Sequence, residues 1–476
     1  PDPKLINPVT GKDLREQGDT TLRFLVWVSI LKSARLDASG LKEKEERMLQ
    51  SWMESHLDSF ASIGQPVRSE LYKHMQKRGR HSSRTFKIAL AATEEPGEVE
   101  AVIQASRRPS KPFNLSIANS GSESTGKWLV SGSFQTNQLT GSDDSLIVGL
   151  SVSDSGERQA IGGAYHIPLL QPGSLILGLG LGYSSYDAST YAVQIIDFEG
   201  DNIYLDTSLK IQPMSWRGEK HSASLGLGLK FENVTAFNSL FINSADTQLL
   251  TPKVEFGLKS TGKYRLAESK VGLYGNLLGI KEDSISALGG IEVTDRYARV
   301  AFSHSEYLRL GKWLMETSGS RAGEYAQHHL FSLRMQANLA LSSNRHLPQH
   351  QFITGGTGSV RGYPESPAAG DHGYFASIEY RIPVFLSEAR TGGTKLVWSA
   401  IPFLDFGKTF VNRPFFFESD QSLFGAGLGF EFQMPYGMLA RFDFAKPLRE
   451  LSSAGVIRDG TKSGDYRVHG LFRWNF

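Results

Sequence analysis

The sequence contains no cysteine among its 476 residues and no long hydrophobic run. Without thiols, the chain has neither a disulfide framework nor a thiolate for catalysis or metal binding. A membrane-spanning helix needs about 20 predominantly apolar residues. The best candidate, Leu22 to Leu31, is about half that length and contains Arg23, so a strand is the favoured interpretation of this segment.

An excess of charge of one sign is missing as well. The 51 Lys and Arg residues nearly balance the 49 Asp and Glu residues, which leaves a formal net charge of +2. A nucleic-acid-binding surface needs a basic patch or stripe, and this composition does not indicate one. The mean hydropathy of −0.26 is typical of a soluble protein. A transmembrane β-barrel is compatible with it, because the lipid face of a barrel strand is hidden in alternation.

Alternation of apolar and polar residues is what the sequence has in abundance from about residue 112 onward. Leu175 to Tyr183 places leucines on one face and glycines on the other, and Phe424 to Gln433 repeats the pattern. These segments run for about ten residues or more, whereas strands of soluble proteins usually have about five or six. A soluble sandwich also alternates, but segment length and glycine on the polar face favour a barrel in lipid.

Counting the alternating segments gives seventeen candidate strands. They lie near 112–119, 126–136, 144–154, 157–167, 173–186, 203–214, 219–233, 249–261, 266–278, 286–293, 297–309, 328–342, 373–385, 395–407, 421–434, 436–446 and 465–476. Bacterial barrels have even strand numbers, so we interpret the neighbouring pair within 286–309 as one element. The fold is therefore predicted to be mainly β, with a sixteen-stranded antiparallel transmembrane β-barrel over residues 108–476.

Residues 21–107 differ in kind from the rest. Apolar residues recur at helical spacing between Leu41 and Phe60, and a second helix is predicted after Pro66. A hairpin follows within 86–104, where a Glu-Glu-Pro-Gly turn separates two apolar strands. With 22–31 as the opening strand, the order is β-α-α-β-β, which predicts a small α+β domain.

The last segment ends on an aromatic residue. Trp474 and Phe476 share an apolar face with Phe472, while Arg473 and Asn475 alternate with them. The pattern resembles the terminal-strand signal by which outer-membrane barrels are recognised for assembly. An ordinary amphipathic last strand is the alternative.

Three short motifs then carry a resemblance to one family. They are NSGSESTG at 119–126, the residues Val360, Arg361, Gly362 and Tyr363 between a GGTGS lead and a GDHGY sequence, and FLDFG at 403–407, which fits an F-x-D-x-G pattern. Together with the small N-terminal domain, they make the chain resemble the two-partner secretion transporters, the TpsB family of the POTRA-plus-barrel superfamily. The resemblance identifies 21–107 as a single POTRA domain after an N-terminal extension at 1–20. It also implies a loop at about 343–372 that is inserted into the barrel lumen.

Arg361 needs a carboxylate partner if that loop lies in a narrow lumen, because an unpaired buried charge is costly. Asp405 lies on the predicted inward face of its strand. We expect Arg361 to pair with Asp405, with Glu431 on the next strand as a second inward acid that shares the arginine. A bidentate arginine–carboxylate pair would fix the loop geometry. An exposed Arg361 on a surface loop is the alternative.

Motifs for catalysis are missing from the sequence. There is no G-x-S-x-G nucleophile elbow, which matters because some POTRA-barrel relatives carry a patatin lipase domain. Gly356 and Gly358 lack the third glycine of a dinucleotide fingerprint, since position 361 is arginine. His328 and His329 have no metal-ligand spacing to other residues. We therefore predict no enzyme, no cofactor and no metal site.

The resemblance implies a protein translocator in the bacterial outer membrane. It would bind an unfolded exoprotein through a periplasmic POTRA domain and pass it through the barrel. Its other partners would be outer-membrane lipids and the assembly machinery during biogenesis, with no nucleic acid, and it would act as a monomer. Family members commonly carry two POTRA domains and a plug helix, for which the residues before the first predicted strand leave no room. Two alternatives therefore stay open, an assembly or insertase factor for outer-membrane proteins and a passive pore.

Overall fold

The structure is a computed structural model that describes two compact units. It covers residues 29–476 except 39, 61–63, 65, 67–82, 109, 123, 171–173, 189–197, 217–220, 239–242, 281, 289–292, 294–295, 319–327, 387–395, 416–417, 454–455 and 458–460. One unit comprises residues up to 110 together with 137–143, and the other comprises 111–136 and 144–476. Within the described residues, every helix is too short or too polar to cross a membrane.

The smaller unit is a three-stranded sheet with a helix. Its elements are β1 (Ile30–Asp37), α1 (Glu43–Phe60), β2 (Arg84–Ala92) and β3 (Glu98–Arg107). The sheet order is β1-β3-β2, with β1 parallel and β2 antiparallel to the central strand. Leu49 of the helix and Ile103 of β3 are buried in its core. The described first strand begins where the predicted one ends, and most of 22–31 and the second predicted helix lie outside the described residues.

The turn 137–143 belongs to this smaller unit through a buried ion pair. The Arg84 guanidinium, whose side chain is fully buried, donates to Glu45 Oε1 at 2.9 Å and to Asp143 Oδ1 at 2.6 Å. Lys42 donates to the carbonyl oxygen of Gln138 at 3.1 Å. These contacts give the turn a defined conformation within the unit.

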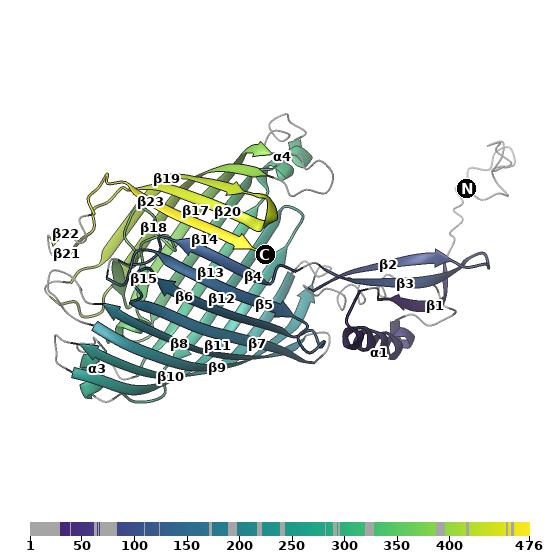
Figure 1. The fold of residues 1–476 in the computed structure, drawn as a ribbon, viewed down its shortest axis with the longest axis horizontal. Coiled ribbons are helices and arrows are strands. Elements are labelled where there is room, and N and C mark those ends of the chain that lie inside the picture. The colour runs from purple at the N-terminus through teal and green to yellow at the C-terminus, as the bar shows by residue number, and fades with distance from the viewer. Residues whose placement is uncertain are drawn as a thin grey trace, which may run out of the picture. The chain divides into compact units, whose positions relative to one another are not determined.

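The larger unit is a closed barrel of sixteen antiparallel strands, as predicted (Figure 1). In chain order they are β4 (Phe113–Ala118), β5 (Leu129–Asn137), β6 (Ser145–Ser153), β7 (Arg158–Leu170), β8 (Leu175–Ala188), β9 (Phe198–Trp216), β10 (His221–Asn238), β11 (Asn243–Thr261), β12 (Arg265–Gly275), β13 (Ala298–Leu308), β14 (Leu330–Ala340), β17 (His372–Leu386), β18 (Val397–Phe410), β19 (Gln421–Gln433), β20 (Met438–Pro447) and β23 (Arg467–Asn475). The last strand pairs with the first, from Leu471–Ala118 to Asn475–Asn114.

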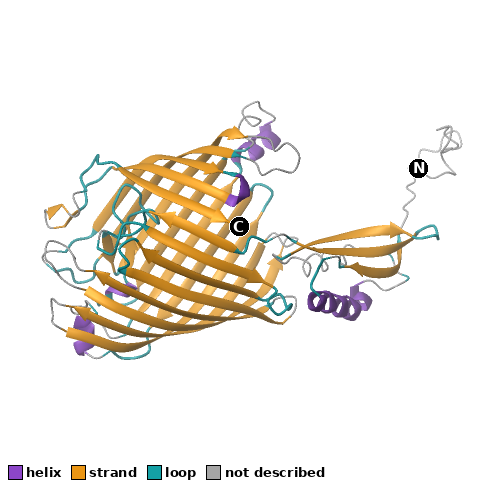
Figure 2. Cartoon of the chain, in the orientation of Figure 1, coloured by secondary structure: helices purple, strands orange, loops and turns teal. Residues whose placement is uncertain are grey.

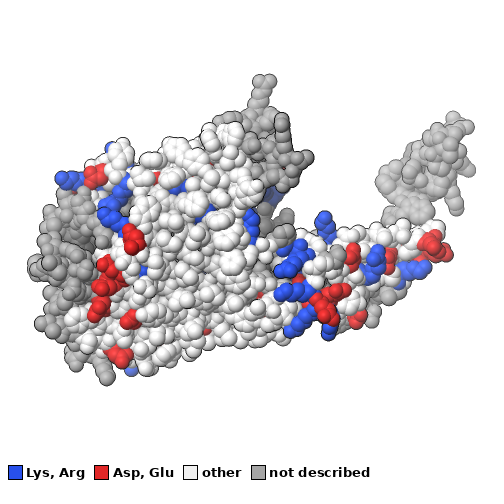
Figure 3. Space-filling view, viewed as in Figure 1, with Lys and Arg blue, Asp and Glu red and all other residues white. Residues whose placement is uncertain are grey.

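The outer wall of the barrel is apolar. On β8, Leu179 and Leu181 point outward and are exposed, while the intervening glycines face the lumen. A Cβ on Gly182 would lie only 2.5 Å from the ring of Tyr204 on β9, so the glycine lets that ring lie flat against the inner wall. Figure 3 shows few charged side chains on the visible outer wall between the barrel ends. This is the distribution that a lipid-facing surface requires.

The prediction of a strand at 286–293 is wrong. The prediction that this segment forms one element with the next strand is wrong as well. Helix α3 (Glu282–Ala287) occupies the start of this segment, and β13 begins only at Ala298. The apolar residues Ala287 and Leu288 are consecutive and both buried, because they pack into a core cluster inside the barrel mouth. Two adjacent buried residues suit a helix end and not a two-faced strand.

Short elements complete the unit (Figure 2). Besides α3, they are helix α4 (Leu310–Ser318), the 3-10 turns η1 (Pro348–His350) and η2 (Pro435–Gly437), and the strand pairs β15 (Phe352–Thr354) with β16 (Ala368–Gly370) and β21 (Ser452–Ser453) with β22 (Val456–Ile457). Residues 341–371, between β14 and β17, contain η1, β15 and β16. We call them the lumen loop. Val360 and Tyr363 of this loop are fully buried against wall residues that include Phe375 and Leu423.

Candidate functional site in the barrel lumen

Glycines let the lumen loop lie directly on the barrel wall. Gly362 has a φ of +94°, and a Cβ there would lie 2.8 Å from the backbone nitrogen of Pro447 on β20. On the wall, a Cβ at Gly425 of β19 would lie 2.0 Å from the carbonyl oxygen of Arg361. Such close backbone approach is possible only without a side chain. The glycine-rich sequence therefore positions Arg361 against the inner wall.

The structure brings Arg361 and Asp405 together. The arginine Nε and Nη2 atoms donate to the two carboxylate oxygens at 2.7 and 2.8 Å, and the backbone N–H of Arg361 donates to Oδ2 at 3.0 Å. Arg361 is 2% exposed and Asp405 is 0% exposed. The pair is thus bidentate and buried, which gives it a fixed geometry.

Two further carboxylates on other strands contact the same guanidinium. Its Nη1 atom donates to Glu379 of β17 at 2.7 Å and to Asp443 of β20 at 3.0 Å, and its Cζ lies 3.5 Å from the centroid of the Phe403 ring. We call Arg361, Glu379, Asp405 and Asp443 the arginine cluster. Through it, one loop residue is bonded to β17, β18 and β20.

The charges in the arginine cluster are partly balanced by Arg441 of β20. Its Nη2 atom donates to Glu379 at 2.6 Å and its Nε atom to Asp443 at 2.9 Å. Burial by itself would lower the pKa of the Arg361 guanidinium, but the hydrogen bonds and charge of Asp405 outweigh burial, and the pKa is raised above its ordinary value. The arginine is therefore cationic at any physiological pH.

The neighbours of Arg361 in the loop are held as well. The Tyr363 hydroxyl donates to the carbonyl oxygen of Arg449 at 2.6 Å and accepts from the backbone N–H of Phe424 at 3.1 Å. The backbone N–H of Gly362 donates to Nε2 of His469 on β23 at 3.2 Å. All four residues from Val360 to Tyr363 are buried. The two residues after the arginine therefore fix the loop tip to β19 and β23 by hydrogen bonds.

Glu431 does not share Arg361, contrary to the expectation from sequence. It accepts from both terminal nitrogens of Arg381 on β17 instead, with Nη2 at 3.0 Å from Oε2. The strand register explains the difference, because Gly425 stands opposite Asp405 whereas Glu431 stands opposite Ser399. Six residues of strand separate the two positions, which is about 20 Å. Glu431 forms an independent ion pair nearer the other barrel end.

The predicted terminal signal residues lie at the closing seam of the barrel. Phe476 exchanges backbone hydrogen bonds with Phe113, at 3.0 and 2.9 Å, and their rings stack at 5.5 Å. Trp474 contacts Phe476 with 4.4 Å between ring centroids. From the 119–126 motif, the Asn119 side chain accepts from Gly470 N–H and donates to the Val468 carbonyl oxygen, both at 2.7 Å. These residues join the first strand to the last.

Sequence reasoning missed Glu379 and Asp443 as partners of the loop arginine. Both lie on the polar face that alternation identifies for their strands. Alternation shows that a residue points inward, but it does not show which inward residues meet across a curved wall. The short spacing between Arg441 and Asp443 was the available signal, since two opposite charges share one inward face there.

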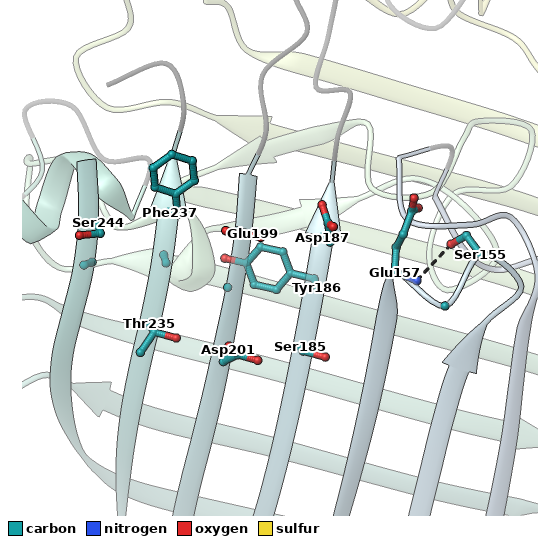
Figure 4. Close-up of a pocket in the computed structure, with 14 residues that line it drawn as sticks. Ser155, Glu157, Ser185, Tyr186, Asp187, Glu199, Asp201, Thr235, Phe237 and Ser244 are labelled. Atoms are coloured by element: carbon teal, nitrogen blue, oxygen red, sulfur yellow. Dashed lines mark hydrogen bonds between the residues drawn. The ribbon is translucent and has the colours of Figure 1, made fainter. Parts of the chain in front are cut away.

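The structure also has a hollow where β8, β9, β10 and β11 end or begin. Its lining residues form no recognisable catalytic or binding arrangement. Its lining includes Glu157, Asp187, Glu199 and Asp201 from several strand ends (Figure 4). Within the residues that the structure describes, no group of three or more His, Asp or Glu side chains is placed to hold a metal ion. The arginine cluster in the lumen remains the candidate functional site.

Comparisons with known proteins agree with this architecture. Residues 97–432 match the family model of the haemolysin secretion/activation proteins ShlB/FhaC/HecB. Among solved structures, CdiB from Escherichia coli is 16% identical with a TM-score of 0.69, and the match covers 94% of this chain and 77% of that one. CdiB from Acinetobacter baumannii is 15% identical with a TM-score of 0.64, over 94% and 74% of the two chains.

A third similar structure is BamA from Haemophilus ducreyi lacking POTRA domains 1–3. It is 15% identical with a TM-score of 0.56, over 94% of this chain and 85% of that one. None of the curated proteins matches the sequence. At these identities the solved structures establish a shared fold, while the family match spans well over half of the chain. The chain therefore belongs to the ShlB/FhaC/HecB family of haemolysin secretion/activation proteins and is an outer-membrane transporter of the two-partner secretion class.

Proposed function

We propose that this transporter secretes one unfolded exoprotein through its barrel. The observation that carries the proposal is a lumen loop bonded by one buried arginine to three strands of a closed barrel. A wall-bound loop inside a barrel obstructs it, and a folded exoprotein would not pass. An extended chain needs only that the loop tip leave the wall.

The arginine cluster is the gate in this mechanism. While Arg361 is paired, the loop tip is held to β17, β18 and β20, and the lumen is closed. Opening replaces these buried contacts with water or with polar groups of the passing chain. Asp405, Glu379 and Asp443 then form an acidic strip on the lumen wall that Arg441 partly neutralises. Nothing in the sequence indicates nucleotide hydrolysis, so cargo folding outside the cell biases the direction of transport.

The smaller unit is the recognition domain in this proposal. We assign 21–107 to a periplasmic POTRA domain, 1–20 to an extension before it, and 108–476 to the barrel. Among the described residues, the sheet order leaves β2 with one unpaired edge, and Lys87 and Ala89 of this strand are exposed. An extended segment of the exoprotein could add to this edge as a further strand, because backbone hydrogen bonds recognise extended chains without a fixed sequence.

Secretion is tested by co-expression of the transporter with a candidate exoprotein in a heterologous outer membrane. We expect the exoprotein in the medium only when the transporter is present. Two further measurements address the alternatives. Depletion that lowers outer-membrane proteins in general would support the assembly factor, to which the fold shared with BamA is relevant. Diffusion of small solutes without exoprotein secretion would support the passive pore. We propose no enzymatic activity, cofactor or bound nucleic acid, and a monomeric transporter in contact with outer-membrane lipids.

A further inference from the structure

The lumen loop contacts opposite walls of the barrel. Its tip, at Arg361 and Gly362, lies against β20. Its first part reaches the other way, where Leu347 is fully buried among Val234 of β10 and Leu249 of β11. In the ring of sixteen strands, β10 and β20 are eight positions apart, which is half the circumference. The loop therefore crosses the whole lumen. It is fixed at its tip, against β20, and at its first part, against β10 and β11.

The contact at the β10 end includes the connection between β12 and β13. Within this connection, residues 276–297, α3 packs against β10 and β11. Val293 forms an isolated parallel bridge with Arg345 of the lumen loop. The ring of Tyr297 lies 4.4 Å from that of His350 and 5.2 Å from that of His346, measured between centroids. The described residues of the connection and the first part of the loop thus pack against each other.

This contact differs in chemistry from the arginine cluster. Leu347 is surrounded by aliphatic side chains, and the two histidines are 1% and 7% exposed. Within the described part of the chain, both ring nitrogens of His346 and Nε2 of His350 have no hydrogen-bond partner. A buried imidazole without a carboxylate partner is neutral, because burial disfavours its charged form. The contact with β10 and β11 is therefore made by apolar and aromatic packing, while Arg345 pairs with Glu418 and the backbone N–H of His346 donates to Asp371.

We propose that residues 345–350 and the described residues of the connection, 276–280, 282–288, 293 and 296–297, form a second anchor of the lumen loop, which we call the apolar anchor. When only the arginine cluster is released, the loop tip leaves the wall, but the first part of the loop stays packed against β10 and β11. Passage of a chain requires 345–350 to separate from the connection as well. The inference rests on the proposed function for its secretion consequence, while its closure of the lumen is measurable without any cargo.

Conductance in planar lipid bilayers tests the anchor without cargo. We expect Leu347→Ala to raise the single-channel conductance, and to raise it further when combined with Arg361→Ala. Leu341→Ala is the matched control, because Leu341 precedes the anchor and is 53% exposed. Heat-modifiable migration on gels checks that each barrel is folded. If Leu347→Ala has wild-type conductance, alone and in the Arg361→Ala background, the apolar anchor does not close the lumen.

A disulfide across the anchor tests whether it must open. The chain has no cysteine, so Val293→Cys with Arg345→Cys introduces a single pair at positions that already form a β-bridge. We expect secretion to fall to background when the pair is oxidised and to return on reduction. The Arg345→Cys single variant controls for the lost ion pair with Glu418. Wild-type secretion by the oxidised protein would overturn the proposal. Absence of secretion by the unmodified transporter would instead contradict the proposed function, and the conductance test would still decide the anchor.

Discussion

Replacement of Arg361 by alanine is the most informative perturbation of this transporter. The substitution removes the ion pairs to three carboxylates and leaves Asp405, which is 0% exposed, without its cation. Breaking a buried pair by removing one partner costs about 3–5 kcal/mol. Every 1.4 kcal/mol is a factor of ten, so the equilibrium between the wall-bound and released loop tip shifts by roughly 10²- to 4 × 10³-fold.

The expected outcome is a barrel that is inserted but no longer gated at the tip. Arg361→Ala should abolish exoprotein secretion, because a loop tip that can no longer rebind the wall cannot return the gate to its starting position between transport events, while heat-modifiable migration remains that of a folded barrel and conductance rises. Arg361→Lys keeps the charge but not the bidentate geometry, so its secretion and conductance should lie between those of the wild type and of Arg361→Ala. In the Arg361→Ala, Asp405→Asn double variant, the buried charge is removed and the loss should be smaller than additive. Secretion at the wild-type level by Arg361→Ala, with unchanged conductance, would refute the role of the arginine cluster.

Three other predictions concern the lumen loop and the inner wall of the barrel. Burial lowers the pKa of His350 to about 3, and the groups that face it are Tyr297, Arg299 of β13, Lys230 of β10 and His346. The neutral imidazole therefore stabilises the apolar anchor fully above its ordinary pKa of about 6.5. This stabilisation is lost as the pH falls toward 3, and at pH 5 the equilibrium constant for the closed anchor is roughly 30-fold lower than at neutral pH. Conductance should rise over that interval, and a flat profile between pH 7 and 5 would contradict the prediction. Gly425→Ala should displace the loop tip, because its Cβ would lie 2.0 Å from the Arg361 carbonyl oxygen, and proteolysis of the loop should become faster than in wild type. Glu431→Gln should leave conductance unchanged, since Glu431 pairs with Arg381 and not with the arginine cluster; a conductance like that of Arg361→Ala would show that the two ion pairs are coupled.

The strands and the faces of the barrel were predictable because alternation is a local property. Leu404 and Phe406 face outward and Asp405 inward, as the period of two requires. The helix α3 was not predictable in the same way, because Ala287 at its end and the adjacent Leu288 are both buried, and their burial depends on a loop that is distant in sequence. The partners of Arg361 were predictable only in part. Its pairing with an inward carboxylate follows from the cost of buried charge, but register decides that Glu379 and Asp443 join and Glu431 does not.

The arginine cluster also has a consequence for biogenesis. Arg361 precedes two of its partners in the chain by 44 and 82 residues, at Asp405 and Asp443. A nascent barrel that has not yet added β18 and β20 offers the loop neither carboxylate. Arg361 then stays solvated, and the loop tip does not bind the inner wall. Only when β18 and β20 are in place does the wall offer the Arg361 guanidinium a buried position with compensating charge. Closure of the lumen thus depends on strands that follow the loop in the chain, and a barrel in which β18 and β20 are missing or misplaced is left open and distinguishable from a finished one.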